Sequence, residues 1–346
     1  MVHSLLAFLF IILICVVVHE FGHYLTALWF GVKVHEFSFG MGPLLWQRQG
    51  RKNAWSVRAI PVGGFVRLAG MGEENEDETV APGEGFQEKS PWKKLIILAA
   101  GPLSNVLLVV VIATVMLMSR GVLDLSTSEV GQLIPGFPAE AAGLRSGDVI
   151  ESVGGINVGD WAGMTREIRS QAVQKSELTL AVRRGEQKLT LVMGTKSQKP
   201  GEPPLIGIRP AVKKLSFFAA LRGSVVYTFN MTLVMLHGLK DMIAHPSAAD
   251  VSGPVGIAAM AGEAAREGFF SLLSFLAIIS LNLGIVNLLP FPALDGGHIV
   301  FAIGELITGR NVSAELEGKI HFIGFMFLGA LIVLITWQDI LRLFGR

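Results

Sequence analysis

Four long apolar runs divide the chain, at about residues 4–30, 95–118, 271–290 and 320–341. A helix needs about 20 mostly apolar residues to cross a bilayer, and each run comes close to or exceeds that length. The first run has no leading Lys or Arg and stays apolar past any plausible cleavage site, so we expect it to be retained rather than removed as a signal peptide. The pattern predicts a polytopic α-helical membrane protein with four transmembrane helices.

Residues 32–70, which follow the first run, show a different pattern. The stretches VHEFSFGMGPLLWQ and WSVRAIPVGGFVRLAG are rich in aromatic and β-branched residues, and the polar turn RQGRKN separates them. They predict a β-hairpin. Because the hairpin is so apolar, it either dips into the membrane, with protein or water covering its backbone, or lies on the surface.

The segment at 119–205 alternates short strand patterns, such as SELTLAVRRG and QKLTLVMG, with turns and one helical stretch, DWAGMTREIRSQA. It predicts a small soluble domain inserted between the membrane parts at 1–118 and 271–346. Between this domain and the third run, region 206–270 contains an amphipathic helix at about 214–245. We expect that helix to lie against the membrane surface, because a fifth span there would reverse the orientation of everything after it.

Basic residues indicate the orientation of the spans. They gather between the first two runs, at Lys33, Arg48, Arg51, Lys52, Arg58, Arg67, Lys89, Lys93 and Lys94, and none precedes the first run. Cytoplasmic loops carry an excess of Lys and Arg, so this loop is predicted to be cytoplasmic. Both termini and the inserted domain are then extracytoplasmic. The acidic run at 73–78 is interpreted as a solvated part of the loop.

The composition agrees with a membrane protein and excludes some other classes. Of 346 residues 51% are hydrophobic and 16% charged, with a mean hydropathy of +0.53. A net charge of +1 provides no excess of positive charge of the kind that binds nucleic acid. The single cysteine, Cys15, cannot form an internal disulfide, and we expect it to have a packing role.

The motif HEFGH at 19–23 places three ionisable groups inside the first apolar run. Such groups are expensive at membrane depth and are usually functional. Residues four apart share a helix face, so His19 and His23 can direct ring nitrogens at one metal ion, about 2.0–2.1 Å from each. Glu20 is then close enough to act as general base without ligating. The alternative is a pair of structural histidines satisfied by neighbouring helices.

A catalytic zinc needs a third protein ligand and one open position. The stretch NLLPFPALDGGH at 287–298 ends the third span with Pro290 and Pro292, which break the helix, and then presents Asp295. With the predicted orientation, this end of the third span is cytoplasmic, as are His19 and His23 in the first span. Asp295 is therefore the candidate third ligand, with a helix cap or turn residue as the alternative.

Taken together, these motifs carry a resemblance to a known family. HEFGH, GFVRLAGM at 64–71, SGPVGI at 252–257 and NLLPFPALDGGH closely resemble the site-2 protease family, in particular the bacterial regulator-of-sigma-E protease type. The run GFPAEAAGLRSGDVIESVGGINV resembles the PDZ modules of bacterial membrane proteases. The implied fold is a four-span helical membrane protein with a membrane-associated β-hairpin and one inserted extracytoplasmic PDZ domain. Well-known enterobacterial members carry two PDZ modules, whereas this segment has room for one.

The resemblance also implies an activity. It implies an intramembrane zinc metalloprotease of the bacterial cytoplasmic (inner) membrane, with its active site toward the cytoplasm. Its substrates would be single-span membrane proteins, such as anti-sigma factors or signal-peptide remnants, in regulated intramembrane proteolysis. His19, His23 and Asp295 match the ligands of one Zn²⁺ ion, Glu20 matches the catalytic base, and Asn287 matches a substrate- or transition-state-contacting asparagine.

The mechanism and the remaining polar residues leave several alternatives. A zinc ion held by the three ligands would supply Lewis-acid chemistry, and Glu20 would take a proton from water and return it to the leaving amine. Asn287 either donates to the developing oxyanion or is a helix-packing amide. His298 is a candidate partner of the Asp295 carboxylate. No role is predicted for His3, His35, His237, His245 and His321, and SGPVGI reads locally as a turn.

Two other functions fit parts of the sequence. A metal transporter would need repeated halves and polar groups in several spans, but the third and fourth spans are nearly free of ionisable residues. A catalytically inactive membrane scaffold with a PDZ domain would not need the four chemical residues, all of which are present. The PDZ domain itself could either bind an extended segment or gate access to the site.

Overall fold

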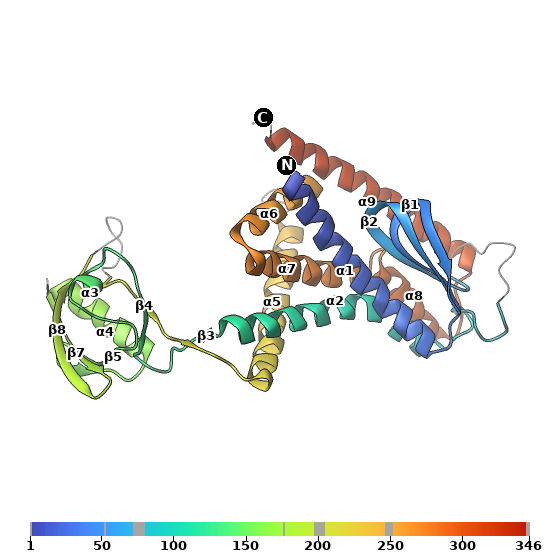
Figure 1. Ribbon diagram of the computed structural model, residues 1–346. Helices are drawn as coiled ribbons and strands as arrows, with labels where there is room; N and C mark the ends of the chain where they lie inside the picture. The colour runs from blue at the N-terminus through green and yellow to red at the C-terminus, as the bar shows by residue number, and fades with distance from the viewer. Residues whose placement is uncertain are drawn as a thin grey trace. The chain divides into compact units, whose positions relative to one another are not determined.

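The structure, a computed structural model, describes residues 2–51, 53–71, 80–175, 177–196, 205–245 and 252–343 (Figure 1). The acidic run at 73–78 lies outside these ranges. The chain divides into two compact units. The first comprises Met1–Thr114 and Leu221–Arg346, and the second comprises Val115–Ala220.

The first unit is mostly helical. Its helices are α1 (Val2–Trp29), α2 (Pro91–Arg120), α5 (Phe217–Ala244), α6 (Pro254–Glu267), α7 (Phe269–Asn287), α8 (Asp295–Thr308) and α9 (Ala314–Leu343). Within the described part of the chain, five helices are long and apolar enough to cross a membrane, namely α1, α2, α5, α7 and α9. The first unit is therefore a bundle with the composition of a membrane protein. The fifth candidate, α5, is the least apolar, with a hydropathy of 1.2 against 2.2–2.7 for the others.

Helix α1 is apolar on all sides, but only one stripe of it is buried by protein. The stripe contains Ala7, Ile11, Cys15, His19, His23 and Ala27, which are four residues apart. This spacing keeps residues on one helix face. Both histidines of HEFGH therefore face the bundle interior rather than its exposed side.

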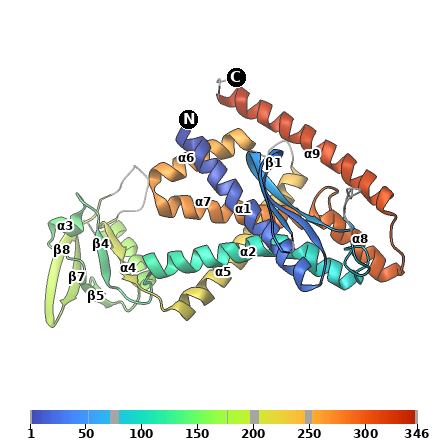
Figure 2. The same cartoon turned by 45° about the vertical axis from the view of Figure 1, so that its right-hand side comes forward.

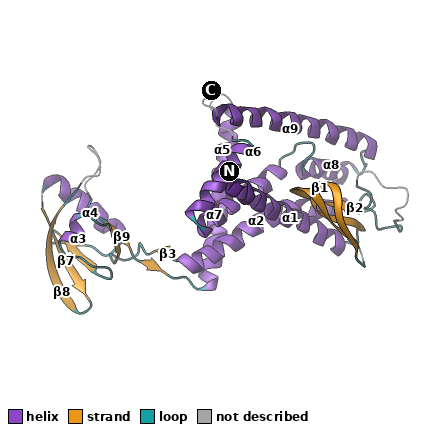
Figure 3. Cartoon of the chain, turned by 45° about the horizontal axis from the view of Figure 1, so that its top comes forward, coloured by secondary structure: helices purple, strands orange, loops and turns teal. Residues whose placement is uncertain are grey.

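The predicted β-hairpin is present as β1 (Val34–Gln49) and β2 (Ala54–Leu68), which pair antiparallel (Figure 3). Phe37 lies opposite both Trp55 and Val66, while the later part of β1 pairs with the start of β2. The hairpin therefore folds back on itself into four short segments. Phe37 is 1% exposed and packs edge-on against Tyr24 of α1, so an aromatic contact fixes the sheet to the helix that carries the motif.

The SGPVGI motif begins helix α6 instead of forming a simple turn. The carboxylate of Asp339, far along α9, accepts hydrogen bonds from the backbone N–H groups of Gly253 (3.1 Å) and Gly256 (2.8 Å). A carboxylate at this position satisfies N–H groups that have no partner within the helix, and it complements the helix dipole. Figure 2 shows α6 beside the start of α1, with the end of α9 nearby.

The second unit is a small mixed domain. It contains β3 (Val122–Leu123), β4 (Val130–Leu133), α3 (Pro138–Ala141), β5 (Val149–Val153), β6 (Ile156–Asn157), α4 (Trp161–Gln174), β7 (Glu177–Arg184), β8 (Gln187–Gly194), β9 (Ile208–Pro210) and β10 (Val212–Lys213). Four strands form a sheet in the order β6-β5-β7-β8, and β4 pairs with β9. The predicted strands of SELTLAVRRG and QKLTLVMG are β7 and β8, and the predicted helix is α4, capped by Asp160.

The turn between α3 and β5 is held by a buried ion pair. Arg184 donates two hydrogen bonds to Asp148, at 2.8 and 2.7 Å. Desolvation by burial acts to raise the pKa of Asp148, but the hydrogen bonds from Arg184 and from the Arg145 backbone hold that pKa below its usual value. The GLRSGD segment is therefore fixed against β7.

The contact between Asp339 and α6 can be tested at Gly253. A Cβ at Gly253 would lie 2.8 Å from both Asp339 Oδ2 and Ile335 Cγ2, so Gly253→Ala should displace the carboxylate. We expect the free energy of unfolding to fall by about 1–3 kcal/mol, seen as a lower thermal unfolding midpoint in detergent. Gly238→Ala in α5 is the control, because a Cβ there meets nothing within 4 Å. Equal midpoints for the two variants would contradict the role of Gly253.

Candidate metal centre

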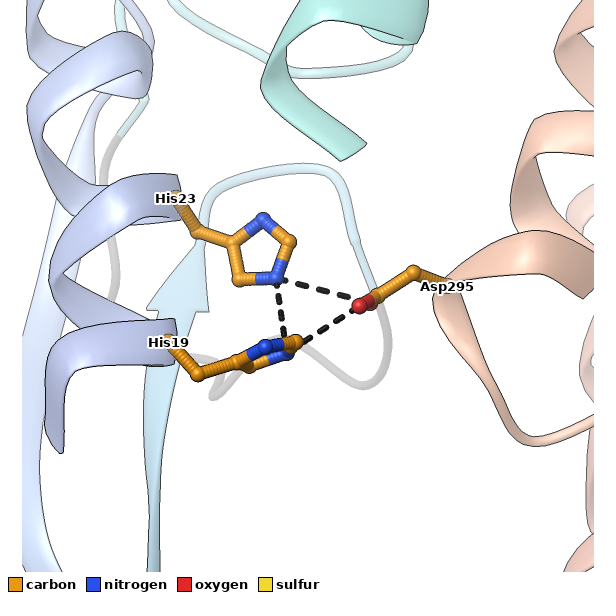
Figure 4. A group of neighbouring side chains, drawn as sticks. All are labelled: His19, His23 and Asp295. Atoms are coloured by element: carbon orange, nitrogen blue, oxygen red, sulfur yellow. Dashed lines mark hydrogen bonds and ion pairs between the residues drawn. The ribbon is translucent and has the colours of Figure 1, made fainter. Parts of the chain in front are cut away.

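Three predicted residues from two distant parts of the chain meet in the first unit (Figure 4). His19 and His23 project from adjacent turns of α1, and Asp295 begins α8. The Nε2 atoms of the two histidines are 3.2 Å apart. Asp295 Oδ2 lies 3.0 Å from His19 Nε2, and Asp295 Oδ1 lies 3.5 Å from His23 Nε2. Both histidines are buried, with 6% and 8% of their surface exposed.

This donor set fits a tetrahedral zinc site. With bonds of about 2.0–2.2 Å, the ligand atoms of a tetrahedral site are separated by about 3.3–3.6 Å. The two nitrogens are 3.2 Å apart, and each lies 3.0 or 3.5 Å from one of the two Asp295 carboxylate oxygens, so the distances lie close to that range. Two ring nitrogens and a carboxylate that converge in a buried place also attract positive charge, which a bound metal ion or a proton on one ring can supply. The three side chains can therefore hold one divalent cation and leave a fourth position open.

The orientation of His23 is fixed by helix α2. His23 Nδ1 donates to the carbonyl oxygen of Ile97 at 2.8 Å, so the lone pair of the neutral ring lies on Nε2, which faces Asp295. Gly101 lies directly against the same ring, and a Cβ there would overlap Nε2. Helix α2 thus approaches α1 closely at a glycine and orients one ligand.

Asn105 lies one turn beyond Gly101 on α2 and contacts the other histidine, His19. Its amide lies 3.5 Å from His19 Nδ1, and its side chain is fully buried. Asn105 Oδ1 has no hydrogen-bond partner among the described residues. Turned toward the ring, this oxygen would accept the Nδ1 proton and leave the Nε2 lone pair for a metal. Neither Gly101 nor Asn105 was predicted, and the only signal for them is the small and polar run AAGPLSN inside an apolar span.

Glu20 lies beside the two histidines and next to the sheet. The backbone N–H of Val66 in β2 donates a hydrogen bond to its carboxylate. A Cβ at Gly64 would lie 3.9 Å from Glu20 Cγ, so the strand passes close to this part of α1. The structure thus places the predicted base between the candidate metal ligands and one end of the hairpin.

Asn287 and His298 lie near the centre but have different contacts. The Asn287 amide nitrogen is 3.3 Å from His19 Nε2, so the last residue of α7 borders the position that the three ligands surround. The expectation that His298 holds the Asp295 carboxylate is wrong: its Nδ1 pairs with Glu317 of α9 at 2.8 Å. The His298 side chain therefore contacts α9 rather than the Asp295 carboxylate.

The segment that presents Asp295 turns sharply between α7 and α8. Pro290 and Pro292 prevent α7 from continuing, and the chain then folds back on itself. A Cβ at Gly296 would overlap the carbonyl oxygen of Leu289, and one at Gly297 would lie 2.6 Å from the carbonyl oxygen of Phe291. The two glycines after Asp295 therefore allow the close return that directs its carboxylate at α1.

The packing of α2 against the centre predicts an effect of Gly101→Ala. The added methyl group would push His23 out of line with Asp295, so the affinity for zinc should fall by about 10–100-fold. Metal content of the purified, chelator-treated and reloaded protein measures the change. Gly329→Ala in α9, where a Cβ meets nothing within 4 Å, should bind zinc like the unsubstituted protein. Normal zinc affinity in Gly101→Ala would refute this view of α2.

The chain is similar to several known proteins over nearly its whole length. A protein of Clostridium acetobutylicum named "Putative zinc metalloprotease" is 34% identical, and the alignment covers 94% of each chain. The zinc metalloprotease RasP of Geobacillus kaustophilus is 28% identical, with 99% of this chain and 98% of that one covered. A solved structure, the PDZ domain of an SdrC-like protein from Listeria monocytogenes, is similar to part of the chain. The alignment has 20% identity and a TM-score of 0.22, and covers 24% of this chain and 85% of that one.

A family model agrees with the sequence similarity. The model for peptidase family M50 matches residues 7–331, a range that includes the two histidines, Glu20, Asn287 and Asp295. The chain therefore belongs to peptidase family M50.

Proposed function

We propose that the protein is an intramembrane zinc protease that cleaves peptide bonds within the membrane segments of single-span proteins, such as anti-sigma factors or signal-peptide remnants. The observation that carries the proposal is the meeting of His19, His23 and Asp295 at separations suited to one zinc ion. Membership of a peptidase family and relatives named zinc metalloproteases support it.

The residues around the centre supply the remaining chemistry. A bound zinc ion supplies Lewis-acid chemistry, which polarises the scissile carbonyl and acidifies water. Glu20, adjacent to both histidines, would take the proton of the attacking water and later give it to the leaving amine. The Val66 N–H that donates to Glu20 holds the carboxylate in place for this transfer. Asn287, 3.3 Å from His19 Nε2, is positioned to donate to the developing oxyanion.

A membrane helix hides its peptide carbonyls in its own hydrogen bonds, so a substrate must unwind before it is cut. The hairpin offers backbone partners for the unwound strand. Segment 64–68 pairs on one side with 34–39, and its backbone reaches Glu20 on the other. We propose that an extended substrate segment adds to the hairpin here, because main-chain hydrogen bonds replace those lost on unwinding.

The contacts between helices support four crossings rather than five. Helix α1 runs antiparallel to α2, since His23 contacts Ile97 while the earlier His19 contacts Asn105. It runs parallel to α7, since Cys15 contacts Leu276 while the later His19 contacts Asn287. Helices α2 and α7 are therefore antiparallel to each other, and the chain between them must cross the membrane an even number of times. The single long helix in that stretch, α5, would then not cross completely.

This arrangement gives a complete proposed topology. The basic loop after α1 is cytoplasmic, so the metal centre faces the cytoplasmic side of a bacterial inner membrane. The second unit, which follows α2, and both termini are extracytoplasmic. We propose that this unit is a single PDZ domain. Its cavity of about 210 Å³ lies between α4, at Trp161 and Ile168, and segment 205–208. Such a cavity suits an extended peptide segment, and the domain could equally restrict access to the membrane site.

Substitution of Glu20 tests the proposal. Glu20→Gln keeps the size of the side chain but removes its capacity to take a proton, so zinc content should be unchanged while cleavage of a co-expressed single-span substrate falls at least about 100-fold. Immunoblotting of the substrate and metal analysis measure the two effects. Glu186→Gln, in an exposed turn between β7 and β8, is the matched control and should cleave normally.

The outcome separates the protease from an inactive scaffold. A scaffold would show no zinc-dependent cleavage in any form of the protein. Cleavage at the normal rate by Glu20→Gln would instead show that another group acts as the base.

A further inference from the structure

A cluster of polar side chains lies between α8 and α9. His298 Nδ1 pairs with Glu317 at 2.8 Å. The rings of His298 and His321 stack at 3.6 Å with an interplanar angle of 10°. His321 Nδ1 accepts a hydrogen bond of 2.9 Å from the backbone N–H of Ala293. The cluster therefore connects α9 to the loop that ends at Asp295.

The three side chains could be taken for a second metal site, because one ligand atom from each lies within 4.8 Å of the others. The hydrogen bond from Ala293 argues against this. It occupies the lone pair of His321 Nδ1, so the proton of the neutral ring must reside on Nε2. Neither nitrogen of His321 is then free to ligate a cation. The cluster instead holds the backbone of the loop in place through the hydrogen bond between Ala293 and His321.

Further contacts of α9 act on the same loop. A Cβ at Gly324, one turn beyond His321, would lie 2.5 Å from the carbonyl oxygen of Pro292. The ring of Phe327 packs against Phe291, with 5.7 Å between centroids. Gly324 and Asp339 are the buried residues of α9 among those described, and most of its apolar side chains are exposed. Packing against the Asp295 loop is therefore a principal contact of this helix with the rest of the unit.

The backbone of the loop needs such support. Ala293 has a φ of +76° and is the residue other than glycine with positive φ in the described ranges. This conformation is unfavourable for a residue with a Cβ and persists only where its surroundings enforce it. Ala293 is two residues before Asp295, so a change in its conformation would redirect the carboxylate.

We propose that His321 is a positioning residue for the third metal ligand: by accepting the N–H of Ala293 it holds the strained turn that directs Asp295 at His19 and His23. The inference rests on the proposed metal centre. It assigns to α9 a role in completing that centre through the backbone at Ala293. A residue of this kind commonly contributes about 10–100-fold to metal affinity.

Three substitutions of His321 distinguish the effect of its hydrogen-bond acceptor from the effect of its size. Asn carries its oxygen where His carries Nδ1, so His321→Asn can still accept the Ala293 N–H. Gln carries its oxygen nearer the position of Nε2, and Leu has no acceptor. We expect the full-length protein in detergent to bind Co²⁺ within about threefold of the original affinity in His321→Asn and at least about tenfold more weakly in His321→Gln and His321→Leu. The visible absorption of bound Co²⁺ should change in the two weak binders, because it reports the geometry of the ligands.

The controls make each result decisive. His237→Leu, on the exposed side of α5, should leave both the affinity and the spectrum unchanged. Thermal unfolding of the metal-free proteins compares their stability without the centre. Original affinity and spectrum in His321→Gln and His321→Leu, or equal weakening in all three variants, would overturn the role of His321. If Asp295→Ala binds Co²⁺ like the unsubstituted protein, the proposed metal centre itself is wrong.

Discussion

The convergence of two imidazoles and one carboxylate within an apolar bundle constrains the rest of the first unit. None of the three groups can be left unpaired at this depth without a large free-energy penalty. Two of them are fixed on one face of α1 by their spacing of four residues. The third, Asp295, comes from the opposite end of the sequence, so α7 must end, and the chain must turn, at the depth of His19 and His23.

Single polar contacts define how the other helices align with α1. Asn105 and Ile97 set α2 antiparallel to α1. Ser280 donates to the carbonyl oxygen of Asn105 and so fixes α7 against α2 at the same level. In a lipid environment apolar surface gives little preference for one helix pairing over another, and close packing and hydrogen bonds decide instead. The few polar residues of these helices therefore determine how the helices align, which their apolar residues do not.

The same reasoning explains what could be predicted from the sequence. HEFGH could be interpreted because its chemistry depends on the spacing within one helix, and Asp295 because the predicted orientation of the spans assigns it the same side of the membrane. The strands and helix of the second unit follow from alternation and capping, as in a soluble domain. The number of long apolar helices was harder, since α5 is only moderately apolar and composition alone does not separate a span from a surface helix.

Residues whose role depends on a contact between distant helices could not be predicted. Gly101 matters because the His23 ring lies against it, and His321 because Ala293 lies beside it. The role of Asp339 is visible only in the structure, where its carboxylate accepts a hydrogen bond from the start of α6. Nothing in the sequence of α2 or α9 indicates which distant residue each of these positions will contact, because that depends on how the helices pack.

The three candidate metal ligands differ in how they are supported, and this difference decides which of them can move independently of the others. His19 and His23 belong to a continuous helix braced by α2, so their separation is set by helix geometry. Asp295 follows a strained turn whose support comes from α9, a helix attached near its two ends and otherwise exposed. A displacement of α9 would therefore move the carboxylate while leaving the histidine pair in place. The completeness of the proposed centre therefore depends on where α9 packs, which links the proposed chemistry to a helix whose apolar side chains are mostly exposed.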